Sequence, residues 1–76
     1  MDKEQLLDQI DDYFANHLSL IKDLGKIKKR DTLLFRFVML STVQNQLQRC
    51  QDEKRIQTLS ALAIAVMEEL DEALRD

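Results

Sequence analysis

The sequence predicts an all-α protein, a small antiparallel three-helix bundle in which the chain runs up-down-up. Helix breakers are scarce: the 76 residues include no proline and one glycine, so long helices are possible and the turn residues of a β-sheet are missing. Three stretches of apolar residues recur at spacings of three and four, the period of one helix face. We therefore expect one domain over residues 1–76, with helices near 3–24, 31–50 and 54–74.

The first predicted helix, 3–24, begins after Asp2, which is placed to cap it, and Gln5 three residues later would complete a capping box. Gly25 is expected to end the helix in the left-handed conformation. The main apolar stripe of this helix consists of Leu7, Ile10, Phe14, His17, Ile21 and Leu24. A second row repeats every seven residues beside it: Leu6, Tyr13, Leu20 and Ile27.

The second predicted helix, 31–50, has Asp31 or Thr32 as its cap, and its first half is apolar almost all round. Its stripe ends near Leu47, and the next stripe starts at Ile56. These positions are nine residues apart, so at about 100° per residue they would lie on opposite sides of a continuous helix. We expect a break near residues 51–54, with Asp52 capping the third helix, and one long bent helix is the alternative.

The stripes predict the core of the bundle. The side chains expected to be largely buried are Phe14, Ile21, Phe37, Leu40, Leu47, Leu59, Val66 and Leu70.

The chain has more apolar surface than a three-helix core needs. One stripe per helix is sufficient, yet the first helix has two rows and the third contains the apolar run 61–67. Because exposed apolar patches usually mark an interface, we expect a protein partner, a homodimer, or both. The residues predicted to bind the partner are Leu6, Tyr13, Leu20, Ile27, Leu34, Phe35 and Met39.

Charge argues against a nucleic-acid partner, because the net charge is −3. The best candidate for anion binding is the basic segment Lys26, Lys28, Lys29 and Arg30. Its alternative role is structural. In an up-down-up bundle this segment would lie beside the acidic end of the third helix, where cations relieve the unfavourable interaction of carboxylates with the helix dipole.

The chain is expected to be cytoplasmic and to have no membrane segment. Cys50 is the only cysteine, so it cannot form an intrachain disulfide, which suits a reducing compartment. The N-terminus lacks the basic-then-apolar pattern of a signal peptide. The apolar runs 37–40 and 61–67 are far too short to span a bilayer.

Residues that could carry chemistry are few. His17 is the only histidine, and the side chains three and four positions away are aromatic or aliphatic, so no second metal ligand stands beside it. Cys50 has no histidine near it in the sequence and is interpreted as a buried, inert thiol. We therefore expect no metal site, no cofactor and no catalytic residue.

One segment offers an enzyme alternative. Gly25 and Lys28 are three residues apart, and His17 precedes Gly25 by eight residues. From Leu7 onward this segment resembles the first helix of the helical chorismate mutases, whose pattern ends in a glycine followed three residues later by a catalytic lysine. That family has an arginine where this chain has His17, and the resemblance does not continue downstream. It implies an enzyme in which Lys28 holds an anionic substrate.

The chain has more apolar surface than its core needs, and we find no sequence motif that specifies a reaction. This combination favours a non-enzymatic interaction module, a small chaperone, adaptor or regulator. Such a module would present an apolar groove to a partner helix or to a second copy of itself. The alternatives are an enzyme like the chorismate mutases and a nucleic-acid-binding accessory protein that uses residues 26–30.

Overall fold

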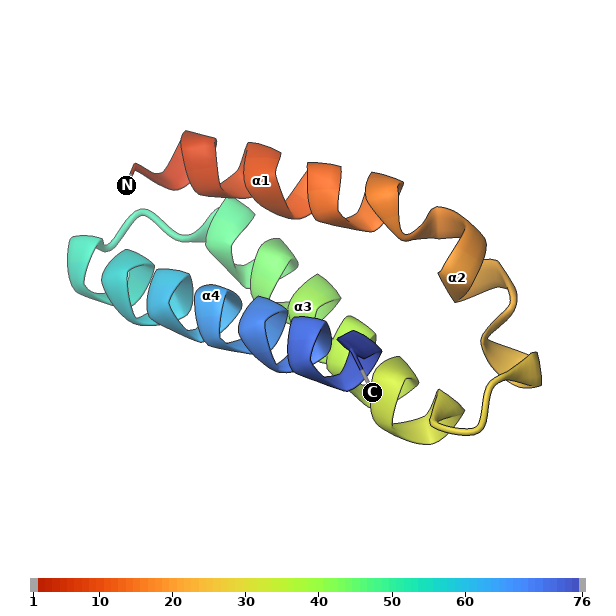
Figure 1. The fold of residues 1–76 in the computed structure, drawn as a ribbon. Helices are drawn as coiled ribbons and strands as arrows, with labels where there is room; N and C mark the ends of the chain where they lie inside the picture. Colours follow the sequence, from red (N-terminus) through yellow and green to blue (C-terminus); the bar gives the residue numbers. More distant parts are fainter. Residues whose placement is uncertain (1, 76) are drawn as a thin grey trace.

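A computed structural model describes residues 2–75, and this range is helical without any strand. Its elements are α1 (Lys3–Asn16), α2 (Leu18–Lys22), the short 3-10 helix η1 (Leu24–Lys26), α3 (Arg30–Arg49) and α4 (Glu53–Arg75). Figure 1 shows α1 running lengthwise along α3 and α4, with α2 and η1 leading to the start of α3 at one end. The molecule measures 40 × 17 × 17 Å, and α3 packs most extensively against α4. The prediction of a helical bundle is confirmed.

The first predicted helix is divided, and this corrects the expected span 3–24. The Asp2 carboxylate accepts a hydrogen bond from the Gln5 amide at 2.8 Å, so the predicted cap is present. The helix nevertheless ends at Asn16, where the His17 amide turns to the Phe14 carbonyl oxygen and the imidazole Nδ1 of His17 donates to the Tyr13 carbonyl oxygen at 2.8 Å. That carbonyl is the acceptor that the His17 amide would use in a continuing α-helix, and such local side-chain bonds compete with helix geometry.

The caps expected at two other helix ends are not formed. Gly25 lies inside η1 and its φ is not positive, so it does not serve as a left-handed helix terminator. The helix α3 starts one residue before the expected range, and neither Asp31 nor Thr32 caps it. Asp31 instead lies in the first turn, where its negative charge interacts favourably with the helix dipole.

The break between α3 and α4 is confirmed. Cys50 has an extended backbone, with φ −86° and ψ 134°, and α4 begins at Glu53. The Asp52 carboxylate accepts from the Lys54 amide at 3.2 Å, as expected for the residue before the helix. Lys3 supports the same turn from α1, because its Nζ donates to the Cys50 carbonyl oxygen at 2.8 Å.

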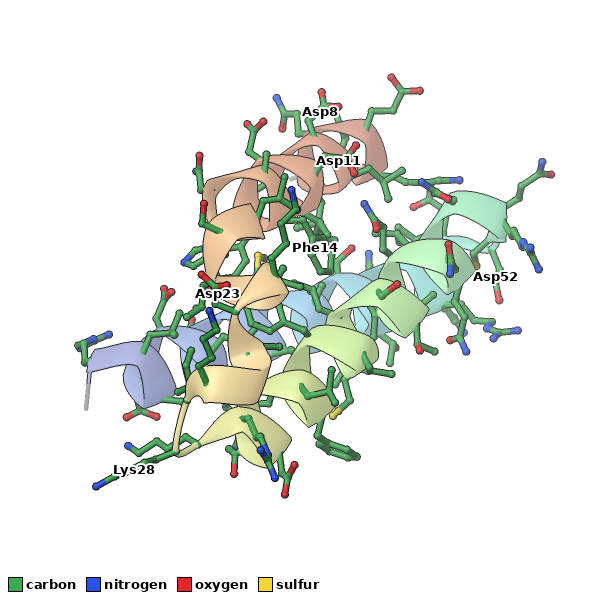
Figure 2. All side chains as sticks on the ribbon, turned by 90° about the vertical axis from the view of Figure 1, so that its right-hand side faces the viewer. Asp8, Asp11, Phe14, Asp23, Lys28 and Asp52 are labelled. Atoms are coloured by element: carbon green, nitrogen blue, oxygen red, sulfur yellow. The ribbon has the colours of Figure 1, made fainter. Side chains whose placement is uncertain are left out.

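The core lies between α1, α3 and α4. Six of the eight side chains predicted to be buried are buried: Phe37, Leu40, Leu47, Leu59, Val66 and Leu70. Phe14 and Ile21 are half-buried and pack against this cluster, and the Phe14 ring centroid lies 6.1 Å from that of Phe37. Figure 2 shows Phe14 between α1 and the helices beneath it. Within residues 2–75, the structure has no helix that is both long enough and apolar enough to cross a membrane.

Candidate functional site

All but one of the exposed large apolar side chains lie on α3 and α4, the exception being Leu18 on α2. Phe35 is 64% exposed, Val38 55% and Leu34 50%, and Leu62 on α4 is 41% exposed. Phe35, Val38 and Leu62, but not Leu34, line a shallow groove of about 250 Å³. The residues that line it are Phe35, Val38, Met39, Thr42, Val43, Gln46 and Leu62. We call this surface the α3–α4 face.

Helical periodicity produces this face. Phe35, Val38, Thr42 and Gln46 are three or four residues apart, so they lie on one side of α3. The opposite side of α3 supplies Leu33, Phe37 and other buried residues of the core. Because α3 has apolar side chains on both sides, the side that faces away from the core stays exposed. Contiguous exposed apolar residues are typical of an interaction surface.

The residues predicted to bind a partner do not form one surface. Leu34 and Phe35 are exposed as expected. Leu6, however, is fully buried, so it cannot present apolar surface to a partner while the bundle is intact. The remaining predicted residues are half-buried and pack against the core: Tyr13, Leu20, Ile27 and Met39.

Two exposed apolar members of the α3–α4 face, Val38 and Leu62, were not among the predicted partner-binding residues. Val38 belongs to the part of the second predicted helix that is apolar almost all round, and Leu62 belongs to the apolar run 61–67. Both signals were therefore present in the sequence. Which member of each apolar stretch remains outside depends on how α3 and α4 pack together.

The basic segment is exposed, and charges of both signs surround it. Lys26 lies in η1, Lys28 and Lys29 lie in the following turn, and Arg30 begins α3. Lys28 extends away from the helices (Figure 2). The Arg30 guanidinium donates to the Gly25 carbonyl oxygen at 3.3 Å.

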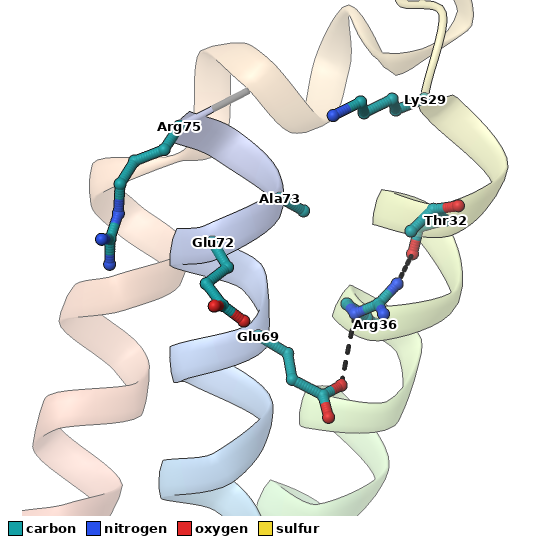
Figure 3. Close-up of a pocket in the computed structure, with 7 residues that line it drawn as sticks. All are labelled: Lys29, Thr32, Arg36, Glu69, Glu72, Ala73 and Arg75. Atoms are coloured by element: carbon teal, nitrogen blue, oxygen red, sulfur yellow. Dashed lines mark hydrogen bonds and ion pairs between the residues drawn. The ribbon is translucent and has the colours of Figure 1, made fainter.

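Lys29 lines an open cleft between the start of α3 and the end of α4. The cleft has a volume of about 660 Å³ and is lined by Lys29, Thr32, Arg36, Glu69, Glu72, Ala73 and Arg75 (Figure 3). Arg36 Nε lies 3.3 Å from Glu69 Oε2, which pairs a cation with the acidic end of α4. The basic segment was expected to compensate the carboxylates at the end of α4. Arg36, which lies outside that segment, provides such a cation. Three cations and two carboxylates line this cleft, so its charges largely offset one another.

His17 and Cys50 occupy boundary positions. The His17 ring stacks on Tyr13 with centroids 4.3 Å apart and lies 6.3 Å from the Phe37 ring. Cys50 is a half-buried free thiol at the turn between α3 and α4, and its Sγ donates to the Asp52 carbonyl oxygen at 3.7 Å. Among residues 2–75, the structure has no cluster of three or more histidine, cysteine or carboxylate side chains suited to a metal ion.

The segment that resembles the chorismate mutases is not one continuous helix. The α-helix ends at Asn16, and Lys28 lies in a turn rather than on a helix face. Lys28 is exposed and extends away from the core, whereas an enzyme of that kind would direct it towards a bound substrate (Figure 2). The local geometry gives this alternative no further support.

Tyr13 connects the end of α1 to the end of α4. Its hydroxyl donates to Asp71 Oδ1 at 2.7 Å, across 58 positions of the sequence. Burial raises the pKa of the Tyr13 hydroxyl above its ordinary value, and the hydrogen bond to Asp71 and the charge of that carboxylate raise it further. The sequence does not indicate this contact, because nothing in the local pattern relates the two positions.

This contact predicts a loss of stability at alkaline pH. The pKa of Tyr13 is higher in the folded than in the unfolded chain, where it is about 10, so the folded state retains the proton more strongly. Stability is therefore complete below about pH 10 and decreases as the pH rises further. Tyr13→Phe should remove this dependence on Tyr13 ionisation and cost about 1 kcal/mol at neutral pH.

The measurement is direct, since Tyr13 is the only tyrosine and the chain has no tryptophan. Phenolate absorbance reports the Tyr13 titration, and denaturant midpoints at about pH 8 and about pH 11 report stability. A phenolate titration near the ordinary tyrosine pKa in the folded protein would contradict the prediction.

Comparisons with family models, with curated proteins and with solved structures found no match to this chain.

Proposed function

We propose that this chain is a non-enzymatic protein–protein interaction module, a small cytoplasmic chaperone, adaptor or regulator. In this proposal its three long helices form an up-down-up bundle, and the α3–α4 face binds an amphipathic helix of a partner or of a second copy. The observation that carries the proposal is the gathering of Phe35, Val38 and Leu62 around one groove, each at least 41% exposed.

Physical chemistry supports this assignment. A groove lined by apolar side chains and rimmed by polar ones takes the apolar face of a helix, with residues of that helix at spacings of three and four as anchors. Thr42 and Gln46 provide the polar rim here. Leaving a phenylalanine 64% exposed forgoes much of the stabilisation that its burial would bring, and a partner covering Phe35 would recover it.

A photo-crosslinking side chain tests which surface is covered. It would replace Val38, which is 55% exposed on the α3–α4 face, and in a matched control it would replace Leu18, which is 51% exposed on α2. We expect an adduct at one defined sequence, identified by mass spectrometry, from position 38 and none from position 18. Either a second copy or a helical segment of another protein at position 38 would support the proposal. Equal labelling from both positions, or none from position 38, would contradict it.

A further inference from the structure

The α3–α4 face carries opposite charges at its two ends. Along α3, one exposed row runs from an acidic to a basic residue: Asp31, Phe35, Val38, Thr42 and Arg49. Along α4, the adjacent exposed row runs from a basic to an acidic residue: Arg55, Thr58, Leu62, Ala65 and Glu69. Both rows follow the three-and-four spacing of one helix side, so each has an apolar or neutral centre between its charged ends.

Contacts between the helices place like charges at the same end. The ion pair between Arg36 and Glu69 brings the start of α3 beside the end of α4. The turn at residues 50–52 joins the opposite ends, where Arg49 and Arg55 lie close in sequence. The face therefore has a basic end with Arg49 and Arg55, an apolar centre, and an acidic end with Asp31 and Glu69.

We infer that the occupant of the α3–α4 face is a second copy of this chain, packed antiparallel about a two-fold axis. The axis lies in the interface, perpendicular to the helices, so α3 of one copy covers α3 of the other. Asp31 then faces Arg49 of the second copy, and Arg55 faces Glu69 of the second copy. This inference rests on the proposed function and names the partner that covers the face.

The charges select this arrangement over the other two-fold packing of the same faces. If the axis ran parallel to the helices, α3 would lie over α4 of the second copy. The basic ends of the two copies would then lie together, and so would their acidic ends. Arg49 would then face Arg55, and Asp31 would face Glu69. Like charges placed opposite each other are unfavourable, whereas the antiparallel packing pairs opposite charges at both ends.

Two other cations lie beside the acidic end, and Glu69 is already partly compensated by one of them, so the contact between Asp31 and Arg49 carries the test below. Arg36 is paired with Glu69 inside the cleft, and Lys29 lines that cleft. Arg30 donates to the Gly25 carbonyl oxygen and also lies 3.8 Å from Asp31, a pair whose side chains are 60% and 95% exposed. An ion pair this exposed contributes little to stability, so the Asp31 carboxylate can still interact with a cation of the second copy.

The size of the face fits a weak dimer. The 20 residues of α3 make a helix of about 30 Å, and two packed helices are about 20 Å wide. A face of about 600 Å² per copy lies at the lower end of specific interfaces, so we expect dissociation in the micromolar range.

Charge reversal tests the arrangement by sedimentation of the full chain at low ionic strength. Arg49→Glu places a carboxylate opposite Asp31 of the second copy, twice in the symmetric dimer, and should raise the dissociation constant about tenfold or more. The double variant Asp31→Arg with Arg49→Glu exchanges the two charges and should restore dimerisation. Lys22→Glu makes the same charge change on α2 and serves as the control, and circular dichroism checks that each variant is folded.

Each outcome separates the alternatives. A tighter dimer with Arg49→Glu would indicate the parallel packing and overturn the inference, as would equal effects of Arg49→Glu and Lys22→Glu. A failure of the exchanged pair to restore dimerisation would also overturn it. If the chain is monomeric while position 38 crosslinks to another protein, the inference fails and the proposed function stands.

Discussion

Replacing Leu40 by alanine is expected to lower the free energy of unfolding by about 2–5 kcal/mol. Leu40 is fully buried at the centre of α3, where it packs in the cluster formed with α1 and α4. Its truncation removes apolar contacts and leaves a cavity that a close-packed interior fills only in part. A domain of this size has a stability of only several kcal/mol, so the variant is expected to be partly unfolded at room temperature.

Denaturant unfolding followed by circular dichroism measures this effect. Leu34→Ala is the matched control, because Leu34 lies on the same helix and is 50% exposed. It should change the free energy of unfolding much less than Leu40→Ala, when measured at a protein concentration that keeps the chain monomeric. Equal midpoints for Leu40→Ala and the unmodified chain would show that α3 does not pack through this side.

Replacing Phe35 by aspartate is expected to disrupt association while the bundle stays folded. The side chain is 64% exposed, so a charge there costs the isolated chain little. In the proposed dimer the same position is covered by the second copy, where a carboxylate would lose water without a cation opposite it, which is strongly unfavourable. The dissociation constant should rise on the order of 30-fold or more, as for a central interface residue. Sedimentation at several concentrations measures this change.

Leu18→Asp is the control for this prediction, since Leu18 is 51% exposed on α2 and lies away from the α3–α4 face. An unchanged dissociation constant for Phe35→Asp would locate the interface elsewhere. Leu20 is unsuitable for a similar substitution. It is half-buried against the core, so a charge there would lower the stability of the fold as well as any association.

Periodicity alone was sufficient for the helical class, the break after α3 and most of the core. The stripes of α3 and α4 each have one dominant apolar side, so Leu40, Leu47 and Leu70 had to face inward for the chain to bury apolar area. The reversal of the stripe between Leu47 and Ile56 also required a break. These features depend on local spacing, which the sequence contains in full.

The orientation of α1 was decided by tertiary packing. Its two adjacent apolar rows are equally plausible from the sequence, and the structure buries Leu6 and Ile10, one from each row, while Leu7 and Phe14 remain half-buried. The end of α1 at Asn16, where the His17 ring binds the Tyr13 carbonyl oxygen, was also not predicted. The helix propensities of individual residues do not predict a side-chain bond of this kind.

The candidate surface shows the same division. The sequence by itself determined that apolar residues exceed one core, because three amphipathic helices need only three stripes. The packing of α3 against α4 decided that Phe35, Val38 and Leu62 are the ones left outside. It also brought Arg36 to Glu69 and Tyr13 to Asp71, pairs that are 33 and 58 positions apart. Contacts at such separations depend on how the helices meet, which no local pattern specifies.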